Sequence, residues 1–172
     1  MSIHIRSFRG RDIETLVLLW RQFQRDPSVI DSPSLPPEKA TRKWRYILLK
    51  QWRRKSIHII LAERNEQLVG YVVLRSRLRQ RKREIAYIQE IYVHPDFRKM
   101  DLGTLLLQRG IKYLRDRGVK IIRVDVWFQN NIARDFFKKY GFEEHIVVLQ
   151  KKLKSITSPI MSAGVNTWFT LT

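Results

Sequence analysis

Two short segments, separated by one predicted helix and one predicted strand, constrain the fold of this 172-residue chain most strongly. The first, V-H-P-D-F-R-K-M-D-L-G, runs from Val93 to Gly103 and follows a predicted strand over residues 85–93. The second, N-N-I-A-R-D-F-F-K-K-Y-G-F, runs from Asn130 to Phe142 and predicts a helix that ends at Gly141. A strand followed by a basic, glycine-containing loop that opens a helix is typical of a phosphate site, because the first N–H groups of a helix lack partners and its dipole favours anions.

The rest of the chain predicts an α/β protein. Period-2 patterns indicate strands over residues 3–8, 57–63, 68–74, 85–93, 120–127 and 142–153. Helical periodicity indicates helices that begin at Asp12 and span residues 38–54, 103–117 and 132–140. The segment Arg64-Asn65-Glu66-Gln67 predicts a hairpin turn. We expect one domain over residues 1–154, built on a mixed sheet with helices on its faces.

Charge is the most unusual feature of the composition. The chain has 34 Lys and Arg against 16 Asp and Glu, a formal net charge of +18, with six basic side chains between Arg75 and Arg83. Such a field attracts phosphates and acidic surfaces, so nonspecific nucleic-acid binding is one interpretation. Solvated loops and helix faces are the alternative. The chain has no cysteine, and its four histidines lack ligand spacing, so we expect no metal site.

The end of the chain differs from the rest. Residues 155–172 carry no charged side chain, which favours an extra strand or a homodimer contact, with a poorly ordered tail as the alternative. The longest apolar runs are too short to cross a bilayer, and arginines interrupt any secretory signal near the start. We therefore expect a cytoplasmic protein that does not enter a membrane.

The two segments together resemble the acyl-CoA site of the GCN5-related N-acetyltransferase (GNAT) superfamily. Val93-x-Pro95-x-x-Arg98-x-x-x-x-Gly103 resembles its pyrophosphate loop, usually Arg/Gln-x-x-Gly-x-Gly/Ala. Asn130-x-x-Ala133-x-x-Phe136-Phe137-x-x-x-Gly141-Phe142 resembles its second CoA element. The resemblance implies an acyl-CoA N-acyltransferase fold, α/β with a mixed, largely antiparallel central sheet flanked by helices on both faces.

The resemblance also implies a role for each matching residue. Backbone groups of Ile91, Tyr92 and Val93 are expected to bind pantetheine, and one N–H there to polarise the thioester carbonyl. The pyrophosphate is expected to meet the Arg98 side chain and the loop from Lys99 through Met100, Asp101, Leu102 and Gly103 to Thr104. Asn130 is expected to bond the pantetheine arm, and Ala133, Phe136 and Phe137 to lie along its channel. Ordinary core packing is the alternative for Ala133 and Phe136, and the two interpretations are compatible. Glu90 is the candidate general base, acting directly or through water; pairing with an arginine is the alternative.

Two positions depart from the family pattern. Asp101 replaces the first loop glycine; it tolerates left-handed backbone, but a carboxylate about 5 Å from a phosphate costs roughly 3 kcal/mol at an effective dielectric constant near 20. Turning the side chain outward would remove most of that cost. Phe137 stands where the family often has a tyrosine that protonates the departing thiolate, so Tyr140, Tyr92 or water would have to substitute.

Two functions are compatible with these observations. The first is an acetyl-CoA-dependent N-acetyltransferase that acts by direct attack of a primary amine in a ternary complex. Its basic surface favours an acidic or phosphate-bearing acceptor, such as an acidic peptide, a protein N-terminus or a small molecule. The second is a catalytically impaired binding module of the same fold that contacts nucleic acid or another polyanion.

Overall fold

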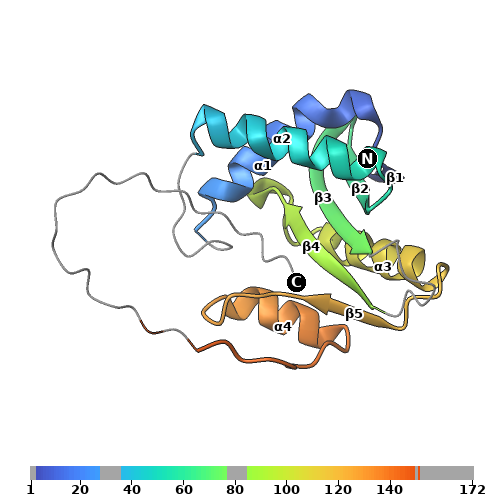
Figure 1. Cartoon of the computed structure of the whole chain (residues 1–172), viewed down its shortest axis with the longest axis vertical. Coiled ribbons are helices and arrows are strands. Elements are labelled where there is room, and N and C mark those ends of the chain that lie inside the picture. The colour runs from blue at the N-terminus through green and yellow to red at the C-terminus, as the bar shows by residue number, and fades with distance from the viewer. Residues whose placement is uncertain (1–2, 28–35, 77–84, 150, 152–172) are drawn as a thin grey trace, which may run out of the picture.

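The computed structural model describes residues 3–27, 36–76, 85–149 and 151. Five strands form one sheet in the order β1-β2-β3-β4-β5 (Figure 1). These are β1 (Ile3–Ser7), β2 (Ile57–Arg64), β3 (Gln67–Ser76), β4 (Ile85–Val93) and β5 (Ile121–Val124). Neighbours from β1 to β4 are antiparallel and β4–β5 is parallel, so the predicted mixed, largely antiparallel sheet is confirmed.

Helices cover both faces of the sheet, as predicted. On one face α1 (Ile13–Arg25) and α2 (Glu38–Arg53) pack with strand residues such as Ile59, Leu61 and Tyr71. On the other face α3 (Leu102–Arg115) and α4 (Asn131–Lys139) pack over residues such as Ile60 and Val72. Two 3-10 turns, η1 (Gly10–Asp12) and η2 (Pro95–Phe97), precede α1 and α3. Alternate residues of β2 therefore serve two separate cores, which explains why the strand is apolar almost throughout.

The predicted hairpin joins β2 to β3. Arg64 pairs with Gln67, and the two residues between them, Asn65 and Glu66, have φ of 48° and 66°. Two consecutive positive φ values are the geometry of a type I′ turn, which matches the twist of antiparallel strands. Asn readily adopts this conformation, and Glu adopts it at some cost.

The predicted strand over residues 142–153 is wrong for its described part. Residues 142–149 form no strand, and Ile146, Val147, Val148 and Leu149 are 70–91% exposed. β5 is also shorter than the predicted 120–127. Branched apolar residues satisfy strand propensity, but a strand also requires a hydrogen-bonding partner, and the described residues provide none for this segment.

Other boundaries differ less. Asp12 does not cap α1 with its side chain; its carboxylate accepts a hydrogen bond from the Arg9 backbone N–H at 2.6 Å and binds the Arg6 guanidinium instead. The uncharged segment 155–172 and most of the basic run 75–83 lie outside the described residues. No helix in the described part of the chain is both long and apolar enough to span a membrane.

Candidate active site

A β-bulge in β4 sets the direction of the candidate base. Val73 of β3 pairs with Glu90, whereas the next residue, Leu74, pairs with Ile88, so Gln89 is an extra residue without a partner in β3. Ile88 packs in the core under α3 and α4, while Tyr92 packs in the core under α1 and α2. Without the bulge, residues 88, 90 and 92 would share one face; with it, positions after Gln89 change faces. Glu90 is thereby directed to the α1–α2 face.

The Glu90 carboxylate is half-buried between two hydrogen-bond donors from different elements. Tyr71 of β3 donates its hydroxyl to Oε2 at 3.0 Å, and Trp44 of α2 donates Nε1–H to Oε1 at 3.4 Å. Burial raises the pKa of Glu90 to about 7, although both hydrogen bonds act in the opposite direction by stabilising the anion. A carboxylate with a pKa near neutrality is suited to accepting a proton at physiological pH.

The second half of β4 separates from its parallel neighbour. β5 pairs with β4 only from Ile85 to Ile88. Beyond the bulge, the described residues provide no strand beside β4 on that side, so backbone groups over residues 89–93 lack sheet partners there. This is where the sequence predicted pantetheine contacts. Among these residues Tyr92 is buried, and burial, followed by the nearby Asp26 carboxylate, raises its pKa to about 12.

The predicted phosphate loop lies directly between β4 and α3. Two of its non-glycine residues, Lys99 and Asp101, have positive φ, 63° and 57°. Asp101 is the left-handed N-cap of α3, and its backbone oxygen accepts the Leu105 N–H at 2.9 Å. Its side chain is exposed and makes no capping hydrogen bond. The aspartate therefore keeps the backbone shape expected of glycine at this position.

Arg98 anchors the same loop to α1. Its guanidinium forms an ion pair with Asp26, which is buried at the C-terminal end of α1, and its Nε–H donates to the Val93 carbonyl at 3.1 Å. The guanidinium also lies 5.8 Å from the centre of the Tyr92 ring. Sequence reasoning missed Asp26, because no local pattern signals a partner 72 residues away. The predicted phosphate ligand is thus held by a carboxylate.

The start of α4 is capped by Asn130. Its side-chain oxygen accepts the Ala133 N–H at 3.0 Å, which uses one of the polar groups predicted to bond pantetheine. The Phe136 ring packs beside Gly103, where a Cβ would lie 3.7 Å from two ring atoms. Ala133 and Phe136 are half-buried against the α3–α4 core. The two motif segments are therefore brought into contact.

The position that lacks the family tyrosine is part of the core. Phe137 is 5% exposed and packs edge-on against Phe142, with ring centroids 5.2 Å apart. The nearby Tyr140 hydroxyl lies 2.6 Å from Thr104 Oγ1 and so joins α4 to the first turn of α3. Thr104 was predicted to meet pyrophosphate; its hydroxyl already has this partner. Met100 is half-buried and Leu102 is buried, so both support the loop by packing.

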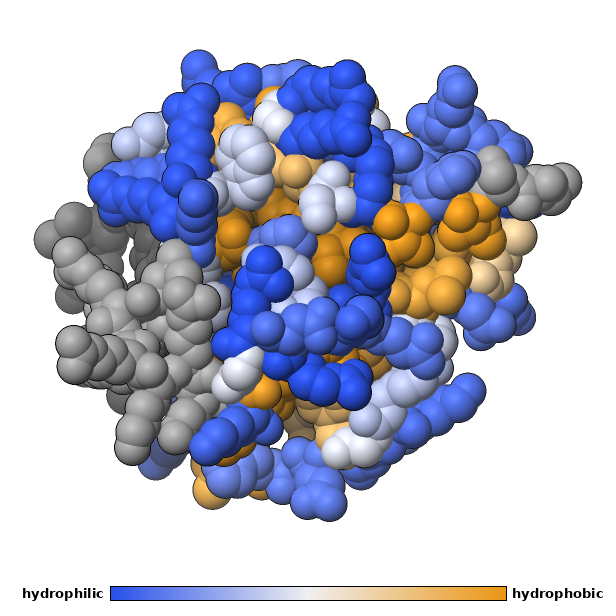
Figure 2. Space-filling model, turned by 90° about the vertical axis from the view of Figure 1, so that its right-hand side faces the viewer, coloured by the Kyte–Doolittle hydropathy of each residue, from blue (hydrophilic) through white to orange (hydrophobic). Residues whose placement is uncertain are grey.

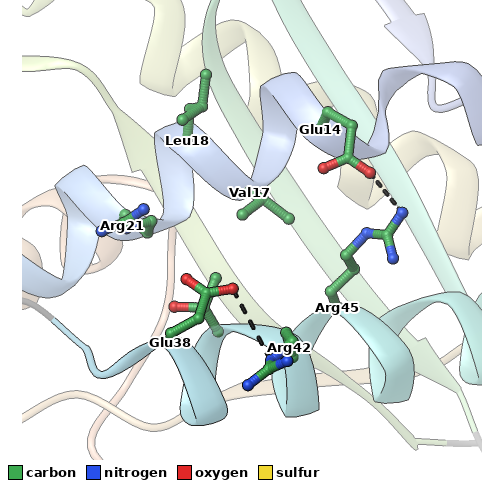
Figure 3. A pocket seen from close by; sticks show the side chains of 8 residues that line it. Glu14, Val17, Leu18, Arg21, Glu38, Arg42 and Arg45 are labelled. Atoms are coloured by element: carbon green, nitrogen blue, oxygen red, sulfur yellow. Dashed lines mark hydrogen bonds and ion pairs between the residues drawn. The ribbon is translucent and has the colours of Figure 1, made fainter.

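Two further cavities lie outside this site. One, of about 270 Å³, lies between α1 and α2, where Glu14 pairs with Arg45 and Glu38 lies 3.9 Å from Arg42 (Figure 3). The other, of about 200 Å³, lies between α3 and the first two strands. The described residues contain no cluster of three or more side chains suited to hold a metal ion.

The sequence and the fold agree on the class of protein. Residues 17–142 match the acetyltransferase (GNAT) family, and the chain belongs to this family. It is 36% identical over 110 residues to an uncharacterized N-acetyltransferase of Methanocaldococcus jannaschii. That match covers 62% of this chain and 49% of the relative, so the chain spans about half the length of the curated protein it matches.

Solved structures of the same fold include acetyltransferases bound to coenzyme A or to a bisubstrate analogue that contains it. One is AAC(6′)-Iy with a bisubstrate analogue, CoA-S-monomethyl-acetylneamine, with a TM-score of 0.68, 16% identity, and coverage of 89% of this chain and 100% of the neighbour. Another is the PaiA N-acetyltransferase from Thermoplasma acidophilum in complex with coenzyme A, with a TM-score of 0.62, 21% identity, and coverage of 83% and 91%. At these identities the likeness establishes the fold alone.

Proposed function

We propose that the chain is an acetyl-CoA-dependent N-acetyltransferase in which Glu90 is the general base. The observation that carries the proposal is the Gln89 bulge. It directs a carboxylate with a pKa near 7 to one side of β4, just where the strand loses its parallel neighbour. An acidic side chain then lies close to a stretch of β4 backbone that has no strand on one side in the described part of the chain.

The loop and the start of helix α3 are the proposed place for the pyrophosphate of acetyl-CoA. Left-handed backbone at Lys99 and Asp101 leads into the first turn of α3, whose N–H groups and dipole favour an anion. Arg98 contributes positive charge from a position fixed by Asp26. The amide nitrogen of Asn130, whose oxygen is used by the cap, is the donor assigned to pantetheine.

The proposed reaction is direct aminolysis of the acetyl thioester. Glu90 accepts a proton from the acceptor ammonium group, directly or through water, and the neutral nitrogen forms a bond to the thioester carbon. A backbone N–H between Ile91 and Val93 stabilises the oxyanion. As the tetrahedral intermediate collapses, the cationic nitrogen loses its second proton to water and the C–S bond breaks. The departing thiolate takes a proton from solvent, because Phe137 has none to donate, and Glu90 returns its proton to solvent. The products are an acetamide and the free thiol of coenzyme A.

The basic surface guides the proposed acceptor. A net charge of +18 repels polycations, so an aminoglycoside, the substrate class in the name of the neighbour AAC(6′)-Iy, is disfavoured here. We expect a primary amine on an acidic peptide or on a phosphate-bearing molecule. A homodimer, cytoplasmic location and nonspecific binding of nucleic acid remain predictions.

The test is release of free thiol from acetyl-CoA with a panel of acidic peptides, phosphate-bearing amines and polyamines. Turnover with an acidic acceptor that falls at least about a hundredfold in Glu90→Gln supports the proposal. Glu143→Gln, a change at an exposed carboxylate after α4, is the matched control and should behave like the unaltered chain. No turnover across the panel, or equal activity in Glu90→Gln, would refute it.

The second candidate, a binding module of the same fold, is favoured by the Arg98–Asp26 ion pair and by the buried Phe137. Calorimetry with coenzyme A separates the two functions. Absence of coenzyme A binding, together with salt-dependent retention on single-stranded DNA, would favour the module.

A further inference from the structure

A second cavity, away from the phosphate loop, gathers basic side chains from β1 and from α3 and its C-terminal end. It has a volume of about 200 Å³ and lies between the second half of α3 and strands β1 and β2. The face on the right of Figure 1, where β1 and the end of α3 lie, is covered mostly by hydrophilic residues, with a hydrophobic patch beside them (Figure 2). The cavity begins about 10 Å along the α3 axis from the start of that helix.

Positive charge dominates the lining. The lining contains four cationic side chains and one carboxylate, that of Asp116. The cations are Arg6 of β1, Arg109 and Lys112 of α3, and Arg117 just after α3. Arg6 is bound by Asp12 and Glu63, and Lys112 Nζ lies 3.0 Å from Asp116. Arg109 and Arg117 are therefore the cations with the most charge to offer a ligand.

Arg117 is held in place by an aromatic stack. Its guanidinium carbon lies 3.6 Å from the centre of the Tyr113 ring, and Nη1–H donates to the Tyr113 carbonyl at 3.3 Å. The opposite partner of Tyr113 is His58 of β2, whose ring is parallel to it with centroids 3.6 Å apart. Order imposed by stacking lowers the entropy that Arg117 would lose on binding a ligand.

His58 adds a neutral polar group to the same wall. Burial, and then the positive charge of Arg117, lowers the pKa of His58 to about 4, so the ring is uncharged at neutral pH. Ser7 Oγ lies 3.4 Å from its Nε2. The charged groups around His58 are Arg6 from β1 and Arg109, Lys112, Asp116 and Arg117 from α3 and its C-terminal end. An anion among them would offset the positive charge that helps to keep His58 neutral.

We propose that this cavity is a binding site for the phosphate group of a small anion, separate from the acetyl-CoA site. Guanidinium groups bind phosphate through paired, charge-assisted hydrogen bonds, and Arg109 and Arg117 supply two of them. The Ser7 hydroxyl and the His58 ring supply neutral hydrogen-bonding groups. A dianion also matches the excess of positive charge better than a single carboxylate does.

His58 provides the reporter for the test. Inorganic phosphate is added to the full-length chain with chloride adjusted to constant ionic strength, and the histidine ring resonances are followed by NMR as the pH is varied from about 4 to 8. Saturable shifts of His58, with its pKa raised in phosphate, are expected. His94, in the loop before α3, distinguishes phosphate that binds at the acetyl-CoA loop instead.

Arg109→Gln and Arg117→Gln should each weaken the His58 response at least about tenfold, since each removes a charged hydrogen-bond donor. Arg42→Gln, at an exposed arginine of α2, is the matched control and should leave it unchanged. The exposed Arg109 variant keeps the test valid if loss of the Arg117 stack unfolds the chain. The proposal is overturned if the His58 resonance does not respond to phosphate. It is also overturned if Arg42→Gln weakens the response as much as the Arg109 and Arg117 variants do, because the general field of a basic protein then explains it.

Discussion

Tyr71 offers the sharpest test of the proposed base. Its side chain is fully buried, and its hydroxyl lies 3.0 Å from Glu90 Oε2. Tyr71→Phe removes this hydrogen bond and keeps the ring. A hydrogen bond to a charged group contributes about 1.5–3 kcal/mol, and one pKa unit corresponds to about 1.4 kcal/mol. The substitution should therefore raise the pKa of Glu90 from about 7 to roughly 8–9.

The assay is the pH dependence of kcat/KM for thiol release, measured with one acceptor for both proteins. A general base acts only when deprotonated, so the acid limb of the profile should move up by about one to two pH units. At pH 7 the active fraction falls from about half to about 1–10%, which predicts a loss of roughly 5- to 50-fold. Near pH 10, where Glu90 is deprotonated in both proteins, their kcat/KM values should be nearly equal. Because the acceptor amine titrates in the same way in both experiments, its contribution cancels.

Trp44→Phe is the matched comparison. It removes the longer hydrogen bond, 3.4 Å, while the phenyl ring can still pack against Trp20, whose ring centroid lies 4.5 Å from that of Trp44. We expect a smaller shift of the acid limb in the same direction. If Tyr71→Phe leaves the limb where it was, or lowers kcat/KM by the same factor at every pH, the assignment of Glu90 as the base is wrong.

Three other outcomes follow from the structure. Burial holds the pKa of Glu90 near 7, above its ordinary 4.5, so the folded chain retains a proton that the unfolded chain releases and stability falls between pH 4.5 and 7. As the pH rises to 8, the free energy of unfolding of Glu90→Gln, measured with urea, should therefore increase by about 1–3 kcal/mol relative to that of the unaltered chain. If the difference between the two proteins stays the same across this pH range, the burial argument is wrong. Asp101→Gly should tighten coenzyme A binding by about tenfold in calorimetry, because it removes a carboxylate beside the proposed position of the phosphates; unchanged affinity would show that the exposed side chain faces away from them. Gly70→Ala would place a Cβ 2.9 Å from the Tyr92 backbone oxygen and should destabilise the β3–β4 pair by about 1–3 kcal/mol, visible as a lower Tm; a Tm equal to that of the unaltered chain would mean that the strands separate without cost.

Local patterns were sufficient for much of the fold. The two residues between β2 and β3, the apolar stripes of the helices and the left-handed backbone tolerated by Asp101 all depend on neighbours within a few positions. The prediction of a strand over residues 142–153 was wrong in its described part, because it depends on more than neighbours within a few positions. Strand propensity is local, but strand formation depends on a partner elsewhere in the chain.

The candidate site was only partly predictable. Spacing singled out the candidate phosphate loop and Asn130, and its place on a predicted strand singled out Glu90 as the candidate base; these roles stay predictions. Two contacts could not be predicted, because they join residues far apart in sequence. They are the ion pair between Arg98 and Asp26 and the hydrogen bond between Thr104 and Tyr140. Each of these contacts occupies a side chain that the sequence had assigned to the phosphate loop.

By itself, the sequence determined the helices, the first four strands and the position of the loop that connects β4 to α3, since turns and apolar periodicity act over a single turn or strand. Only the tertiary structure decided which way Glu90 faces. That direction depends on Gln89 being an extra residue between the β4 partners of Leu74 and Val73, and a bulge exists only relative to the strand beside it. The pKa of Glu90 follows from the same fact, because burial against α2 and two donors from other elements are consequences of the face on which it lies.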